Sequence, residues 1–313
     1  MGRGAAIGVV RFLPVILLVL LIPMRAFAEN KAVLDGDSIG DPLSADLDEI
    51  LTTPASQWRS PLLEVYRWDR FPDILIIDTI DLPLQDRMFT RLAYFVEKKG
   101  FRGKLLTNER LAGRHGWNAH DYGPDGLASF FNAASEHMFP LNTEEKALED
   151  LALREGILVA DGDRVAAGEG GVLSISRGSS AIERRYLLTH ESFHGIFFSS
   201  AEYRDFCFRL WDSLPSAERR FYRTFLDSLG YDSGNRFLAV NEFQAYLMQQ
   251  PLAYAPGYFE RFIIRFKDAG MKTAIDPARL VAAAKALDAF LFSRFEQHAG
   301  ETLRRAGQTA MAP

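Results

Sequence analysis

The chain has 313 residues, of which 48% are hydrophobic and 25% are charged, and its formal net charge is -5. This length and composition suffice for one large domain or two lobes with a substantial core. The slightly acidic balance argues against a nucleic-acid-binding protein, which normally carries a basic surplus.

The first 28 residues have the pattern of a secretory signal peptide. Arg3 and Arg11 precede an apolar run over residues 12–24, and Ala26–Ala28 forms a small-x-small cleavage site. The apolar run is shorter than the roughly 20 residues that a transmembrane helix needs. We therefore expect export to the periplasm or secretion, cleavage after Ala28, and no membrane span in the mature chain. An uncleaved membrane anchor is the alternative.

Residues 29–66 are expected to form an irregular leader, since Asp, Ser and Pro are frequent there, and ordered structure is expected from about Trp68. A lobe containing a sheet then extends over residues 67–200. Short apolar runs predict its strands, and apolar positions at helical spacing predict its helices. The strands are expected at 73–78, 103–107, 157–160, 164–167 and 172–176, and the helices at 85–99, 126–136, 143–155 and 180–198.

Residues 201–313 are expected to form an all-helical lobe. Gly230 and Pro251 mark helix ends, and Asp276-Pro277 marks a helix start. Cys207, the single cysteine, lies between two phenylalanines and is expected to be a buried apolar residue rather than a nucleophile. The fold class is therefore α+β. The helices of this lobe are expected at 201–213, 216–229, 238–250, 257–268 and 277–305.

The motif His190-Glu191-Ser192-Phe193-His194 carries the chemistry. On a helix, two histidines four residues apart project from one face and can bind one zinc ion. Glu191 projects about 100° away and could act as a general base on water at that ion. The residues around the motif are uncharged, as expected of a helix buried in a cleft. The alternative is a core helix with two hydrogen-bonded histidines.

A catalytic zinc ion needs a third protein ligand. Position 200 is Ser, so a third histidine six residues after His194 is absent. Glu242 is the best candidate, because it lies in an apolar predicted helix where a carboxylate needs a partner. Glu202, Asp205 and Asp232 are weaker candidates.

His-Glu-x-x-His followed by Glu242-x-x-Ala245 resembles the gluzincin class of zincin metallopeptidases. The resemblance implies an N-terminal lobe with a small twisted sheet, a backing helix and an edge strand before the motif helix, and a helical lobe that supplies the last ligand. It implies zinc, with His190, His194 and Glu242 as ligands and Glu191 as base. Residues 172–176 would then be the edge strand that binds extended substrate.

The chain departs from this pattern at Tyr246, because many gluzincins have an aspartate there that orients a ligand histidine. Tyr246 could accept the imidazole N–H, stabilise the oxyanion, or pack as a core aromatic. Other candidate oxyanion donors are Tyr231, Tyr254, Tyr258 and His298.

A second cluster of histidine, aspartate and aromatic residues covers His115–Tyr122. These residues could form a substrate loop or another metal site, but their spacing matches no metal-ligand pattern, so we interpret the cluster as an ordered structural loop.

We thus expect a zinc metallopeptidase that acts on peptides or proteins, with cell-wall peptide crosslinks as a substrate suggested by export alone. The alternative is a non-catalytic, metal-stabilised periplasmic binding protein that uses the cleft for recognition.

Overall fold

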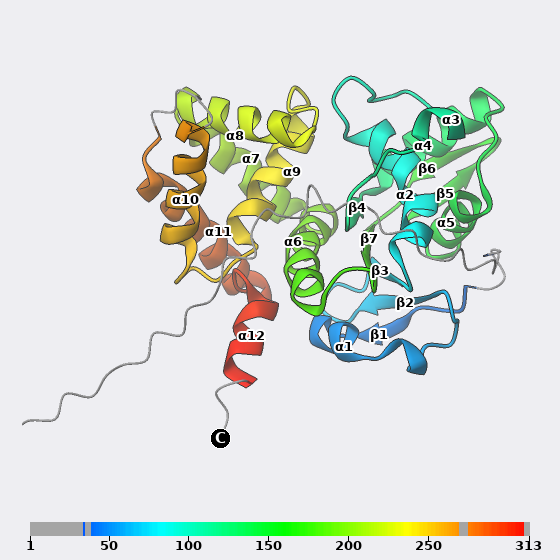
Figure 1. Ribbon diagram of the computed structural model, residues 1–313, viewed down its shortest axis with the longest axis horizontal. Helices are drawn as coiled ribbons and strands as arrows, with labels where there is room; N and C mark the ends of the chain where they lie inside the picture. The colour runs from blue at the N-terminus through cyan, green and yellow to red at the C-terminus, as the bar shows by residue number, and fades with distance from the viewer. Residues whose placement is uncertain (1–33, 35–38, 269–274, 310–313) are drawn as a thin grey trace, which may run out of the picture. The chain divides into compact units, whose positions relative to one another are not determined.

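The computed structural model describes residue 34 and residues 39–268 and 275–309 (Figure 1). The expected signal peptide lies outside these residues. The described chain has a mixed α+β fold with a small mixed sheet and many helices, as expected. None of the described helices combines the length and the hydropathy that crossing a bilayer requires.

The main sheet has five strands in the order β1-β2-β3-β7-β4. β3 and β7 run parallel at its centre, and β4 pairs antiparallel with β7. All six residues of each central strand are buried, because helices cover both faces. The strands are β1 (Leu43–Ala45), β2 (Leu63–Trp68), β3 (Ile74–Thr79), β4 (His120–Tyr122) and β7 (Gly171–Ser176).

The expected edge strand at 172–176 is therefore wrong: β7 lies inside the sheet, and β1 and β4 are its edges among the described strands. The alternation of Ser174 and Ser176 with apolar residues suggested a half-exposed strand. Both serines are in fact buried, and Ser174 accepts a hydrogen bond of 3.0 Å from Gln85. A buried serine that is hydrogen-bonded therefore gives the same sequence alternation as an exposed serine.

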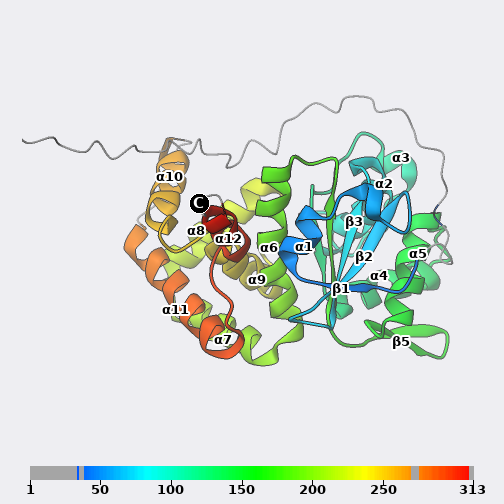
Figure 2. The same ribbon diagram turned by 90° about the horizontal axis from the view of Figure 1, so that it is seen from below.

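The sheet lies between two helical layers (Figures 1 and 2). One face packs against α2, α4 and α5, and a hairpin of β5 and β6 extends this layer. Gly162 has φ +61° in the hairpin turn, as its Asp-Gly sequence predicts. The elements are α2 (Leu82–Val96), α3 (Asn108–Leu111), α4 (Pro124–Glu136), α5 (Thr143–Arg154), β5 (Leu158–Asp161) and β6 (Arg164–Ala167).

The other face of the sheet packs against α6 (Ala181–Ser199), the helix that carries the motif. A Cβ on Gly195 would lie only 3.2 Å from Ile74 and 3.3 Å from Leu173. Glycine therefore lets this turn of α6 approach the central strands closely. The approach places the histidines beside the end of β4.

Three expectations for the first lobe are corrected. The leader at 29–66 is partly ordered, since it contains β1, α1 (Leu47–Thr52), the 3-10 helix η2 (Ala55–Gln57) and most of β2. Glu64 interrupts the apolar pattern of β2, but its side chain is buried and its Oε1 lies 2.6 Å from a guanidinium nitrogen of Arg59. Residues 103–107 form no strand, while β4 was missed because three residues are too few to show a period.

The remaining helices match the expected helical lobe, with one correction. The expected helix at 277–305 ends at Phe295, because Glu296 has φ +53° and turns the chain out of the helix. Gly230, with φ +94°, ends α8 as predicted. The helices are α7 (Ala201–Ser213), α8 (Ser216–Leu229), α9 (Arg236–Met248), α10 (Ala255–Asp268), α11 (Pro277–Phe295) and α12 (Glu301–Thr309).

Candidate metal centre

A capping box fixes the start of α6, the helix that carries the motif. Ser180 accepts a hydrogen bond from the backbone N–H of Glu183, whose side chain accepts one from the N–H of Ser180 at 2.9 Å. The helix then continues without a break to Ser199. Its regular geometry brings the rings of His190 and His194 within 4.8 Å of each other, centroid to centroid.

α9 brings Glu242 to the two histidines. The Nε2 atoms of His190 and His194 are 3.1 Å apart, and Glu242 Oε2 lies 3.6 Å and 3.9 Å from them. Ligand atoms at about 2.0–2.1 Å from a tetrahedral zinc ion are separated by about 3.3–3.5 Å. The three atoms therefore form a triangle of the size that a zinc ion would complete. We call His190, His194 and Glu242 the ligand triangle.

The ligand triangle is buried, and its carboxylate has no arginine or lysine partner in any described ion pair. His194 is fully buried, and Glu242 is 1% exposed. Within the described part of the chain, Glu242 Oε2, which faces the two histidines, has no hydrogen-bond partner. Leaving buried polar atoms unpaired costs about 1–3 kcal/mol each, and more for charged groups. A divalent cation would offset this cost, so the donor set fits zinc.

Glu191 lies next to the ligand triangle, on the neighbouring face of α6. Its side chain is buried, and its Oε2 also has no hydrogen-bond partner among the described residues. Burial, followed by the charges of Glu242 and Glu97, raises the pKa of Glu191 well above its usual range. Strongly perturbed carboxyl groups of this kind are common at catalytic sites.

The other carboxylates proposed as third ligand do not reach the site. Glu202 is paired with Arg294 at 2.8 Å on the surface, and Asp205 is exposed. Asp232 is half-buried, and its backbone N–H donates to the carbonyl of Glu97. Glu242 is thus the one of the four that the fold brings to the histidines.

The sequence reasoning missed Asp121. The cluster 115–122, expected as a structural loop, contains β4 and places Asp121 Oδ2 3.5 Å from His194 Nδ1. Asn241, the residue before Glu242, donates a hydrogen bond of 3.1 Å to the same oxygen. Only the pairing of β4 with β7, about 50 residues later in the chain, brings Asp121 here. The local pattern singled out the cluster but gave no indication that Asp121 would lie beside His194.

Tyr246 contacts the ligand triangle through its ring, whose centroid lies 4.7 Å from that of His190. Its hydroxyl shares a hydrogen bond with Tyr231, and burial, with the charge of Glu242, raises its pKa well above the usual value. His190 Nδ1 instead lies 3.0 Å from Gln249 Oε1. The role of holding this imidazole therefore falls to Gln249 and not to Tyr246.

The alternatives to Tyr246 lie at different distances from the site. Tyr231 joins the cluster through its hydrogen bond with Tyr246, and Tyr258 is connected through Gln249 at 2.6 Å. Tyr254 is 64% exposed, and His298 is held by Asp288 at 3.2 Å. Tyr246 and Tyr231 are therefore the hydroxyls nearest the chemistry.

Cys207 is fully buried, as expected, and burial raises the pKa of its thiol. A thiol in this setting is not ionised at neutral pH and is a poor nucleophile.

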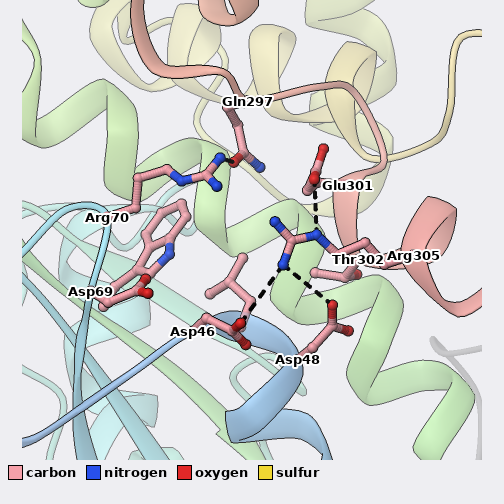
Figure 3. Close-up of a pocket in the computed structure, with 10 residues that line it drawn as sticks. Asp46, Asp48, Asp69, Arg70, Gln297, Glu301, Thr302 and Arg305 are labelled. Atoms are coloured by element: carbon pink, nitrogen blue, oxygen red, sulfur yellow. Dashed lines mark hydrogen bonds and ion pairs between the residues drawn. The ribbon is translucent and has the colours of Figure 1, made fainter.

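A surface pocket elsewhere in the molecule is built from internally paired charges (Figure 3). Arg305 lies 2.9 Å from Glu301 and 3.6 Å from Asp48, and Arg70 donates to Gln297 at 2.8 Å. Because its arginine is paired with carboxylates of the same chain, this pocket contrasts with the ligand triangle.

No family model, no curated protein and no solved structure matches this chain. The functional argument therefore rests on the residues themselves.

Proposed function

We propose that this protein is a zinc metallopeptidase that resembles the gluzincins, with His190, His194 and Glu242 as zinc ligands and Glu191 as general base. One observation carries the proposal: the three ligand atoms lie 3.1–3.9 Å apart in a buried site. The arrangement of a small sheet, a backing helix α2 and a motif helix α6 supports it. So does the helix α9, which supplies the carboxylate.

A zinc ion in this site would supply Lewis acidity that polarises a carbonyl and lowers the pKa of water to about 7. The chain's own contribution is the proton transfer. Glu191, with its raised pKa, accepts a proton from the attacking water and delivers it to the leaving amine. Tyr246 is the proposed oxyanion donor, because Gln249 already holds His190.

The proposed substrates are peptides or proteins outside the cytoplasm. The N-terminal pattern, with cleavage after Ala28, supports export to the periplasm or secretion. Peptide crosslinks of the cell wall are the substrate that this location suggests.

A second candidate is a metal-stabilised binding protein without hydrolytic activity. The observation that favours it is burial, since His194 and Glu242 are at most 1% exposed, as in a closed structural site. Glu191 argues against it, because a purely structural site has no evident need for a buried carboxylate beside the ligands.

The test compares the full-length protein with Glu191→Gln on a mixed peptide library, with bound zinc measured for each. We expect the wild type to cleave, a chelator to stop cleavage, and added zinc to restore it. Glu191→Gln should keep its zinc and lose about 10²–10⁴ in rate, the usual contribution of a general base.

Glu202→Gln is the matched control, since it removes an exposed carboxylate of the rejected third-ligand set and should leave cleavage unchanged. One equivalent of zinc with no cleavage by either protein would favour the binding protein. Absence of bound zinc would refute both candidates.

A further inference from the structure

Both motif histidines direct one ring nitrogen into the ligand triangle and the other away from it. The Nε2 atoms face each other and Glu242. His190 Nδ1 lies 3.0 Å from Gln249 Oε1, and His194 Nδ1 lies 3.5 Å from Asp121 Oδ2. The outer nitrogen of His190 is thus hydrogen-bonded to an oxygen acceptor, whereas that of His194 lies 3.5 Å from a carboxylate oxygen without a described hydrogen bond to it.

The two acceptors are themselves held in place. Asn241 donates to Asp121 Oδ2, and Gln249 donates its own N–H to the Tyr258 hydroxyl at 2.6 Å. In this arrangement the Gln249 amide directs its nitrogen to Tyr258 and its oxygen to His190. Asp121 comes from the edge strand β4, so the sheet and α9 together surround the ligand triangle.

We propose that Asp121 and Gln249 are positioning residues, which orient His194 and His190 by accepting the N–H of each outer nitrogen. This inference rests on the proposed zinc site. A zinc-bound histidine whose other N–H is held by a carboxylate or an amide has a fixed tautomer and ring orientation and is a more basic ligand. In many gluzincins, an aspartate at the position of Tyr246 orients a ligand histidine. Here Asp121, on the edge strand β4, would orient His194 instead.

Asp121 has a competing role. Asp121, Glu191 and His194 offer ligand atoms that all lie within 4.8 Å of one another, which would suit a second cation. That arrangement would require His194 to bind a cation through each nitrogen and would remove Glu191 from proton transfer. The positioning role is favoured because Asn241 holds Asp121 Oδ2 beside His194, and because His194 directs Nε2 into the ligand triangle, which leaves Nδ1 as the nitrogen that can donate to Asp121.

The test measures zinc stoichiometry and affinity by chelator competition in the full-length protein, with the absorption spectrum of the cobalt form as a probe of ligand geometry. We expect the wild type to bind one equivalent. Asp121→Asn should still bind one equivalent, but about 10–100-fold more weakly, the usual effect of removing such a partner. Its cobalt spectrum should differ from that of the wild type.

Two variants separate positioning from general stability. Asp78→Asn changes a buried carboxylate that contacts the same helix through Arg184, and it should lower thermal stability while zinc affinity and the cobalt spectrum stay unchanged. Gln249→Met, which keeps the side-chain length but removes the acceptor, should weaken zinc binding as Asp121→Asn does.

If Asp121→Asn fails to fold, Asn241→Ser tests the same link by releasing Asp121, and it should weaken zinc binding several-fold.

Unchanged zinc affinity and an unchanged cobalt spectrum in these variants would overturn the positioning role while leaving the zinc site intact. Two equivalents in the wild type, with one lost in Asp121→Asn, would make Asp121 a ligand and would also overturn it. If the wild type binds no zinc, the proposed function itself has failed.

Discussion

Two buried charge clusters lie along the single helix α6 and are built in opposite ways. Near the start of the helix, Arg184 makes two hydrogen bonds of 2.7 and 2.8 Å to Asp78, and Arg177 adds a third contact at 2.8 Å. We call this the arginine cluster. Near the end of the helix, His190, His194, Glu191 and Glu242 have no arginine or lysine partner in any described ion pair.

The two clusters also differ in what determines the pKa of their carboxyl groups. Burial raises the pKa of Asp78, but the hydrogen bonds and charges of Arg184 and Arg177 oppose that shift. Burial and two further carboxylates all raise the pKa of Glu191. The arginine cluster therefore pairs its carboxylate with two arginines, whereas no described ion pair brings an arginine or lysine to Glu191 or Glu242. Such a difference separates a structural cluster from a candidate active site.

The largest expected effect breaks the arginine cluster. Asp78→Asn leaves Arg184 buried without its anionic partner, which should lower the free energy of unfolding by about 3–5 kcal/mol. Chemical denaturation checks the loss of stability, and chelator competition checks zinc affinity. Because the helix end that carries the motif is packed separately through Gly195, affinity should stay unchanged in the folded protein. A parallel loss of zinc binding would show that the two clusters are not independent.

The second prediction concerns the stabilisation of the folded protein by zinc at the ligand triangle. Zinc at about 1,000 times its dissociation constant should raise the free energy of unfolding by about 4 kcal/mol, because it binds the folded state alone. Thermal unfolding with zinc and with chelator measures this difference. Glu242→Gln should abolish most of the zinc-dependent shift, whereas Glu202→Gln should retain it. Equal shifts in both variants would exclude Glu242 as a ligand.

The third prediction concerns the hydroxyl beside the ligand triangle. Tyr246→Phe keeps the ring packed on His190 but removes the proposed oxyanion donor, and should lower kcat by about 10²–10³ with little change in zinc affinity. Steady-state kinetics on the peptide found by library cleavage provide the measurement. Tyr231→Phe is the comparison, and a larger loss there would transfer the role to Tyr231.

The smallest effect lies at the helix start, where the Ser180 carbonyl accepts the backbone N–H of Arg184, ten residues before His190. Ser180→Ala removes one half of the capping box and should cost about 1 kcal/mol of stability. Denaturation midpoints measure it, and kcat should be unchanged. A loss of activity at permissive temperature would show that fraying of α6 reaches the motif.

The sequence predicted those features that depend on residues close together in the chain. The spacing of His190 and His194, the Ser180 capping box and the Asp-Gly turn each lie within a few residues of the element that they specify. Glu242 was found because a carboxylate in an apolar helix needs a partner. These features predicted that His190, His194 and Glu242 lie together, as the structure shows.

Long-range pairing determines the rest, and the sequence did not reveal it. β4 has three residues and gains its place only by pairing with β7, so the local pattern did not indicate that Asp121 would lie beside His194. Buried Ser174 made a central strand resemble an edge strand, and Glu296 ended a helix by adopting a positive φ without being glycine. In each case a contact distant in sequence overrides the local pattern.

The most direct test of the zinc site is a crystal structure of the zinc-loaded protein with anomalous data at the zinc edge. We predict one peak about 2.0–2.2 Å from His190 Nε2, His194 Nε2 and a carboxylate oxygen of Glu242. A peak at other residues, or a zinc-loaded crystal whose peak lacks Glu242, would contradict the account.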